Sequence, residues 1–278
     1  MCSSLDCSAL VDGTSVTSTF YLARGEIHQG YDAARWLPEE TVEVWISAVK
    51  RRAGDLTVGT ICDIGSGTGR FAGALAEGFS ALVYAIEPSA KMLEVARAKW
   101  AANATARGEV RFLCAAAEAI PLPDDSSDMV FMSQVYHHLE DPDRALGEVR
   151  RILRPGGIVA IRQATRENIE SVILFKFFPA ARELEYHRLP PRRGVIEALM
   201  HAGFVDPGFE TITQVFSATH EEYLEKVGRR GLSALRMISD EEFQRGLERL
   251  RSYCVPRSRE GPVTESFDLI WARRPEGN

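Results

Sequence analysis

The sequence lacks the features of a secreted, membrane-spanning or metal-dependent protein. No stretch approaches 18 apolar residues, and the N-terminus MCSSLDCSAL has no basic segment and no apolar run of signal-peptide length. The five cysteines show no CxxC spacing, which zinc sites and redox dithiols use. We therefore expect a cytoplasmic protein without a bound metal.

The sequence also lacks an excess of basic residues. Lys and Arg number 33 against 39 Asp and Glu, a net charge of −6. Such a chain has no overall positive field to attract nucleic acid or an anionic membrane surface. The charge predicts a small-molecule partner, with no nucleic acid and no stable membrane insertion, and it leaves a homo-oligomer open.

The composition is that of a folded globular chain. Hydrophobic residues make up 45% and charged residues 26% of 278 positions, which excludes a disordered or collagenous protein. A chain of this size buries about 75% of its unfolded surface, enough for a full core. No internal repeat or low-complexity linker interrupts it, so we expect one domain with insertions.

Short apolar runs alternate with helical patterns through the first part of the chain. Strands are predicted at 60–64, 81–87, 110–115, 128–133 and 157–163, and two more at 210–217 and 266–274. Helices are predicted after Pro38, near Arg70, after Ser89 and after Asp141. This alternation predicts an α/β fold, a doubly wound, seven-stranded, mostly parallel sheet.

Three segments lie outside this alternation. Residues 1–40 are predicted to form an N-terminal arm or cap, and 41–278 the main domain. Residues 165–192, rich in aromatics, are predicted to form a lid over the substrate, and 218–256 a helical insertion. Two capping boxes, Thr219 with Glu222 and Ser239 with Glu242, start helices within that insertion.

The segment C-D-I-G-S-G-T-G-R, residues 62–70, joins the first strand to a helix. Its glycines let the backbone approach a ligand closely, and the helix N-terminus supplies unpaired N–H groups. Glu87 ends the second strand, 18 positions after Gly69. At this place a carboxylate can accept hydrogen bonds from both hydroxyl groups of a ribose. A dinucleotide fingerprint needs glycine at position 70, where this chain has Arg70, which disfavours a nicotinamide dehydrogenase. The pattern indicates a nucleotide-like ligand without a pyrophosphate.

Five segments together resemble the class I S-adenosylmethionine-dependent methyltransferases, in the small-molecule branch that includes the ubiquinone and menaquinone biosynthesis enzymes. They are D-I-G-S-G-T-G (63–69), I-E-P-S-A-K-M-L (86–93), A-E-A-I-P-L-P-D-D-S-S-D (117–128), S-Q-V-Y-H-H-L (133–139) and L-R-P-G-G (153–157). The length and the aromatic arm also resemble the actinobacterial enzymes that C-methylate a prenyl chain in teleocidin biosynthesis.

The resemblance implies S-adenosyl-L-methionine as the cofactor and assigns its contacts position by position. Arg35 would reach the methionine carboxylate, Glu87 the ribose, and Ser133 the sulfonium side. The implied cofactor-binding residues are Tyr31, Arg35, Asp63, Gly65, Ser66, Gly67, Gly69, Glu87, Pro88, Met92, Ala117, Glu118 and Ser133. Ala116 stands where the family usually has an Asp that accepts from the adenine amino group, so adenine recognition falls to backbone groups or Glu118.

The acceptor is predicted from aromatic residues. Its predicted contacts are Phe20, Tyr21, Phe175, Phe178, Tyr186 and His187, although residues 175–187 are equally typical of plain core. His138 or His137 is the predicted base if the acceptor is a phenol or amine. If it is an alkene or activated carbon, aromatic walls would stabilise the developing cation instead.

The sequence therefore predicts methyl transfer to an apolar small molecule, an aromatic or isoprenoid natural product, with carbon favoured over oxygen or nitrogen as the methylated atom. The alternative is a protein on the same fold that binds the cofactor without methylating, or a cyclase.

Overall fold

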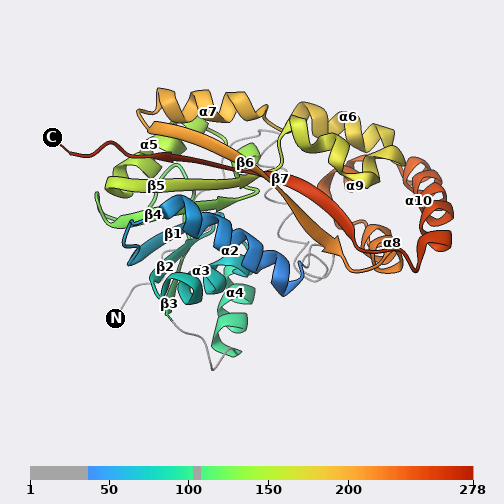
Figure 1. The fold of residues 1–278 in the computed structure, drawn as a ribbon, viewed down its shortest axis with the longest axis horizontal. Helices are drawn as coiled ribbons and strands as arrows, with labels where there is room; N and C mark the ends of the chain where they lie inside the picture. Colours follow the sequence, from blue (N-terminus) through green and yellow to red (C-terminus); the bar gives the residue numbers. More distant parts are fainter. Residues whose placement is uncertain (1–36, 103–107, 278) are drawn as a thin grey trace.

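The computed structural model describes residues 37–102 and 108–277. Within them one sheet has seven strands in the order β3-β2-β1-β4-β5-β7-β6 (Figure 1). The strands are β1 Thr60–Ile64, β2 Leu82–Ile86, β3 Glu109–Leu113, β4 Ser127–Ser133, β5 Leu153–Gln163, β6 Val205–Ser217 and β7 Val263–Arg273. Strands β1 to β5 pair in parallel, and β7 runs antiparallel to both of its neighbours. The predicted fold class is confirmed.

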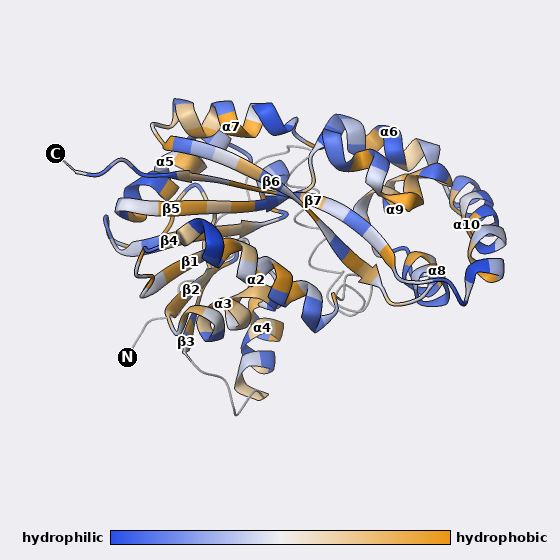
Figure 2. Ribbon diagram, viewed as in Figure 1, coloured by the Kyte–Doolittle hydropathy of each residue, from blue (hydrophilic) through white to orange (hydrophobic). Residues whose placement is uncertain are grey.

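Side chains alternate along each central strand between two hydrophobic layers. On β4, Met129 and Phe131 join the layer under α2 (Glu39–Ala53) and α3 (Arg70–Phe79). Val130 and Met132 join the opposite layer under α5 (Pro142–Ile152) and α7 (Arg192–His201). Figure 2 shows the hydrophobic residues concentrated in these central strands. A sheet buried on both faces leaves only its ends for a ligand.

Local sequence explains where α5 begins, and pairing explains where it ends. The Asp141 side chain accepts a 3.0 Å hydrogen bond from the Arg144 backbone N–H, and Pro142 occupies the first turn. The helix ends at Ile152, and β5 begins at once with Leu153, opposite Ser127 of β4. The sequence predicts this strand only from Gly157. The sequence of residues 154–157 is typical of a turn. The strand includes them because its register with β4 shifts after Ser127 and Gly156 adopts a φ of +76°.

β6 also begins earlier than predicted, at Val205 rather than Glu210. Asp206, Pro207 and Gly208 are typical of a turn, and the register with β7 shifts between Val205 and Gly208. Beyond the sheet, β6 and β7 continue as a two-stranded ribbon to the helices α8 (His220–Gly228) and α10 (Asp240–Cys254), with α9 (Ser233–Met237) between these helices in the chain (Figure 1).

Both predicted capping boxes start helices of this insertion. The Thr219 side chain accepts from the Glu222 N–H at 3.1 Å, and Ser239 and Glu242 bond each other's backbone reciprocally. These local bonds satisfy N–H groups that a helix leaves free at its first turn.

The predicted lid, residues 165–192, contains two short 3₁₀ helices, η3 (Arg166–Ser171) and η4 (Ile173–Lys176), and α6 (Pro179–Arg188). Asp268 of β7 anchors its base. The buried carboxylate accepts from Thr165 Oγ1 at 2.7 Å, Asn168 Nδ2 at 3.2 Å and Arg192 Nε at 2.7 Å. These bonds lower the pKa of Asp268, although burial alone would raise it. Thr165 and Arg192 are the first and last residues of the segment, so both of its ends are fixed to the same residue of the sheet.

None of the helices in the two described stretches combines the length and the apolar composition needed to cross a membrane. The predicted arm, residues 1–40, lies almost wholly outside the described residues.

Candidate active site

The loop after β1 carries three glycines with different structural needs. All three have positive φ: +65° at Gly65, +57° at Gly67 and +79° at Gly69. A Cβ on Gly65 would overlap Val135, and one on Gly69 would lie 3.0 Å from the Cβ of Ala96. A Cβ on Gly67 would meet only the sulfur of Met92, at 3.9 Å. Gly67 is thus the glycine that borders open space.

Glu87 follows β2 directly and is 1% exposed. Its Oε2 accepts a 3.0 Å hydrogen bond from the Gly67 N–H, and its Oε1 accepts one of 3.1 Å from the Ser89 N–H. A carboxylate has further acceptor positions beyond these two. The structure therefore brings the glycine loop into contact with Glu87, the residue predicted to bind the ribose.

Asp63, near the end of β1, and Ser66, in the loop after it, have polar side chains that no described residue satisfies. Asp63 is 2% exposed, and no described side chain or backbone N–H bonds its carboxyl group. Burial, and then the charge of Glu87, raise the pKa of Asp63 to about 8. Ser66 Oγ is buried without a hydrogen-bond partner among the described residues. A ligand that brings a cationic group and hydrogen-bonding atoms fits this loop.

The remaining predicted cofactor residues lie around the same end of the sheet. Met92 is buried on α4 (Ala90–Ala102), and Ala117 is buried in the loop after β3. Ser133 ends β4 and accepts from Arg162 Nη1 at 3.2 Å. Glu118 Oε1 accepts from the Glu140 N–H at 3.2 Å, which ties it to the turn after residue 138. Pro88 follows Glu87. Tyr31 and Arg35 lie outside the described residues.

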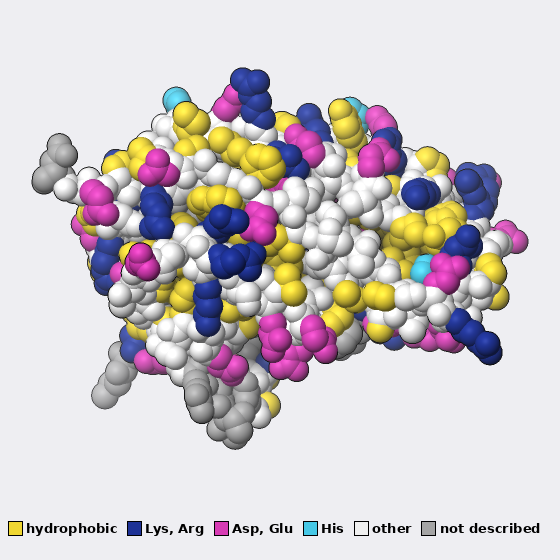
Figure 3. All heavy atoms as spheres, in the orientation of Figure 1, with side chains coloured by type: hydrophobic (Ala, Val, Ile, Leu, Met, Phe, Trp, Pro, Cys, Tyr) yellow, Lys and Arg dark blue, Asp and Glu magenta, His cyan; other side chains and the backbone are white. Residues whose placement is uncertain are grey.

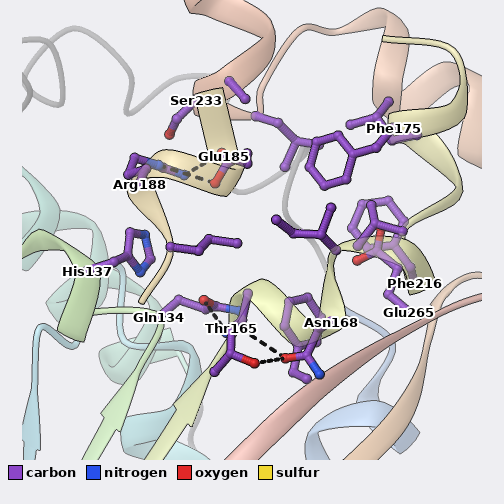
Figure 4. Close-up of a pocket in the computed structure, with 18 of the residues that line it drawn as sticks. Gln134, His137, Thr165, Asn168, Phe175, Glu185, Arg188, Phe216, Ser233 and Glu265 are labelled. Carbon is purple, nitrogen blue, oxygen red and sulfur yellow. Dashed lines mark hydrogen bonds and ion pairs between the residues drawn. The ribbon is translucent and has the colours of Figure 1, made fainter. Parts of the chain in front are cut away.

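A cavity with about 940 Å³ of empty space, including its mouth, lies beside the ends of β4 and β5. Arg70, which follows the glycine loop, is one of its walls, so the cavity meets the loop directly. We call it the acceptor pocket (Figure 4). It is lined by Leu37, Arg70, Gln134, His137, Arg162, Ala164, Thr165, Asn168, Ile169, Val172, Leu174, Phe175, Glu185, Arg188, Leu189, Gln214, Phe216, Leu232, Ser233, Ala234, Glu265 and Phe267.

Of the predicted acceptor residues in the described part, Phe175 alone lines the acceptor pocket. Phe178 is 2% exposed and packs in the core, with its ring 5.9 Å from that of Phe243. Tyr186 is 43% exposed, and His187 is exposed beside Glu183. On α6 the pocket is lined by Glu185 and Arg188, and the two residues between them are not in the lining. Phe20 and Tyr21 lie outside the described residues.

The two adjacent histidines have different positions. His137 lines the acceptor pocket, whereas His138 is 6% exposed and is not part of its lining; their ring centroids are 4.0 Å apart. Gln163 Nε2 lies 2.7 Å from His137 Nδ1 and 2.8 Å from the Ala164 carbonyl oxygen. With the amide so oriented, Nδ1 accepts and the proton of neutral His137 is on Nε2. In the described part of the chain, no three His, Cys, Asp or Glu side chains gather as metal ligands.

Charged and polar pocket residues on the strands were not predicted. Arg162 of β5 is 4% exposed and donates from Nη2 to Gln214 Oε1 at 2.8 Å. Trp45 Nε1 donates to the same oxygen at 2.7 Å, and the Arg162 guanidinium lies 4.7 Å from the Trp45 ring. Glu265 of β7 lines the pocket next to Gln214 of β6. The sequence feature that could have predicted Arg162 is a charged residue inside an otherwise apolar strand.

The comparisons with known proteins agree with this geometry. A family model described as a methyltransferase domain matches residues 62–161. An uncharacterized methyltransferase of Mycobacterium tuberculosis is 37% identical over 131 residues, 47% of this chain and 46% of that protein. The ubiquinone/menaquinone biosynthesis C-methyltransferase UbiE of Vibrio parahaemolyticus is 28% identical over 59% of this chain and 71% of its own. The chain spans about half the length of the first of these relatives.

Among solved structures, a protein described as a methyltransferase from an antibiotic biosynthesis pathway of Anabaena variabilis shares the fold. Its TM-score is 0.65 at 23% identity, over 86% of this chain and 98% of that chain. Sheet order, glycine loop, acidic residue after β2 and matched domain coincide in one molecule. Residues 62–161 match a methyltransferase domain, and the described residues have the fold of the class I S-adenosylmethionine-dependent methyltransferases.

Proposed function

We propose that this chain transfers the methyl group of S-adenosylmethionine to an apolar small molecule bound in the acceptor pocket. The proposal rests on the contact between the glycine segment, where the donor would bind, and the acceptor pocket. Arg70 is the last residue of that segment and also lines the pocket. A donor on the loop and an acceptor in the pocket would therefore share one space.

The donor supplies a methyl group on a positively charged sulfur. The buried Asp63 and the open side of Gly67 are the groups that would face its methionine part, and Glu87 would hold its ribose. The chain's main contribution is orientation, since holding donor and acceptor in line can lower the barrier by about 7 to 11 kcal/mol. The predicted contacts Tyr31, Arg35, Pro88, Met92, Ala117, Glu118 and Ser133 remain part of this proposal.

The walls of the acceptor pocket suit an aromatic or isoprenoid molecule. Ile169, Val172, Phe175, Leu189 and Phe267 offer apolar area without hydrogen-bonding groups. His137 lines the pocket, and in the tautomer in which Nδ1 accepts from Gln163 its other ring nitrogen carries the proton. A phenol needs a base that removes its proton, which His137 does not supply in this tautomer, so the arrangement supports carbon over a phenolic oxygen as the methylated atom.

Surface charge supports a small molecule over nucleic acid. On the face drawn in Figure 3, Lys and Arg side chains lie interspersed with Asp and Glu. Nucleic-acid binding depends on clustered cations that release phosphate counterions.

The test is transfer of label from methyl-tritiated S-adenosylmethionine to a panel of prenylated indoles, quinones, phenols and amines, with the methylated atom located by NMR. We expect label in apolar acceptors, on carbon. Donor binding without transfer to any panel member would favour the alternative, a non-methylating cofactor-binding protein or a cyclase. Transfer confined to polar metabolites would contradict the apolar pocket.

A further inference from the structure

Glu265 is a buried carboxyl group that lines the acceptor pocket and has no hydrogen-bond or ion-pair partner among the described residues. It lies on β7 directly opposite Gln214 of β6 and is 6% exposed. Among the described residues, none donates a hydrogen bond to its side chain and none forms an ion pair with it. Burying a carboxylate without a partner costs several kcal/mol. A group that faces a cavity in this state is suited to a ligand.

The cations nearest to Glu265 are bonded elsewhere. Arg162 of β5 donates to Gln214 and Ser133. Lys226 of α8 donates to the Phe216 carbonyl oxygen at 2.6 Å and pairs with Glu222 at 2.8 Å. Burial raises the pKa of Glu265 to about 7, and these two positive charges hold it from rising further. Burial, and then the charge of Glu265, raise the pKa of Tyr223, which also lies on α8.

Glu265 lies at the end of the pocket remote from the glycine loop, where the methyl donor would bind. Figure 4 shows His137 and Glu265 on opposite sides of the cavity. His137 and Gln134 follow β4, near the glycine loop, whereas Glu265 lies beside Phe216 on the ribbon of β6 and β7. An acceptor whose reacting atom lies near His137 would place its other end at Glu265.

We propose that Glu265 binds a protonated amine at the end of the acceptor remote from the methylated atom, so that the acceptor is an apolar molecule with one basic nitrogen. An ammonium group supplies the hydrogen bonds and the charge that the carboxylate lacks. Phe216 and Phe267, also in the lining, already lie near protein cations: Lys226 Nζ is 5.1 Å from the Phe216 ring, and the Arg162 guanidinium is 4.8 Å from the Phe267 ring. An anionic acceptor would meet a buried acid, and a pure hydrocarbon would leave that acid unpaired.

This inference rests on the proposed function for the place of the acceptor, but it is tested by binding alone. The probes are 2-phenylethylamine and 2-phenylethanol, which differ only in the terminal group, titrated by calorimetry in the presence of S-adenosylhomocysteine. We expect the amine to bind at least tenfold more tightly than the alcohol at pH 7.5. The preference should grow from pH 6 to pH 8, because Glu265 ionises in this range while the amine, like a lysine with pKa about 10.4, stays protonated.

Glu265→Gln should bring the two affinities within about twofold, whereas Glu260→Gln, at an exposed position before β7, should preserve the amine preference. Thermal unfolding establishes that each variant is folded, and Glu265→Met, which also removes the carboxylate, replaces the first variant if it is not. Equal binding of the two probes to the wild-type chain, no binding of either, or an amine preference that persists without Glu265 would overturn the proposal. An amine preference in a chain that transfers no label to the acceptor panel would support the anchor and favour the non-methylating alternative.

Discussion

The backbone N–H of Gly67 donates a 3.0 Å hydrogen bond to Oε2 of Glu87. The bond joins the loop after β1 to the end of β2, so the two sequence segments that identify the family also touch in space. A ligand that bonds Glu87 would meet this loop as well.

Loss of the Glu87 charge should weaken donor binding. We expect Glu87→Gln to reduce the affinity for S-adenosylhomocysteine by roughly 1.5 to 3 kcal/mol, the range for hydrogen bonds to a charged group. Calorimetry measures this, with Glu94→Gln on the exposed side of α4 as the matched control. Unchanged affinity in Glu87→Gln would remove this residue from the ribose.

Asp63 should stabilise the fold at low pH and destabilise it at high pH. Its pKa in the folded chain is about 8, against 3.8 for an unburied group, so the folded state binds the proton more tightly. The stabilisation is fully present below pH 4 and is lost as the pH rises through 8. At pH 8.5, Asp63→Asn should therefore raise the free energy of unfolding by about 2 to 5 kcal/mol relative to the wild type.

The same substitution should weaken donor binding, because the amide cannot pair with a cationic group. Urea unfolding at pH 5 and 8.5, together with calorimetry, measures both effects. Equal stability gains at the two pH values would contradict the assigned ionisation, and unimpaired donor binding would remove Asp63 from the site.

Two glycine substitutions should have opposite effects on stability. Gly65→Ala places a Cβ into Val135 at a φ of +65°, so we expect a loss of about 2 kcal/mol or more. Gly147→Ala, in α5 with no atom near its Cβ position, should gain about 0.5 to 1 kcal/mol. Denaturant midpoints measure both changes in stability. An unchanged stability of Gly65→Ala would mean that Val135 can move aside.

Removal of residues 1–36 should abolish donor binding and preserve a cooperatively folded sheet. The resemblance places Tyr31 and Arg35 on the methionine carboxylate, while Leu37 is buried and lines the acceptor pocket. A truncation at residue 40 would remove Leu37 and the start of α2, so the cut belongs before it. Normal donor binding by the truncated chain, measured by calorimetry, would show that the arm is dispensable.

Phe175 and Tyr186 form a matched pair for the acceptor site. Phe175 lines the pocket, and Tyr186 of α6 is exposed under Arg166. Phe175→Ala should raise the KM for an apolar acceptor by about tenfold or more, since a buried phenyl ring contributes about 1.5 to 3 kcal/mol. Tyr186→Ala should leave it unchanged. The KM values are measured in a labelled-methyl assay. A larger increase in KM for Tyr186→Ala than for Phe175→Ala would place the acceptor on the outer side of α6.

Several features could be predicted from the sequence because their causes are local. The strand Thr60–Ile64 is apolar and ends in glycines, the helix after Asp141 has its cap and its proline, and both capping boxes start helices where they stand. Parallel pairing then follows from the alternation of strands and helices. The loop of glycines and Glu87 came together as expected because the carboxyl ends of adjacent parallel strands meet at one edge.

The acceptor pocket was decided by tertiary structure alone. Arg162, Gln214 and Glu265 are separated by about fifty residues each along the chain, and they converge only because β7 inserts antiparallel between β5 and β6. Phe178, Tyr186 and His187 were predicted from composition, but the rotation of α6 on its neighbours turns Glu185 inward and leaves Tyr186 and His187 outside. A side chain's type sets what it can bind, whereas its direction depends on how distant elements pack, and a single sequence does not record that packing.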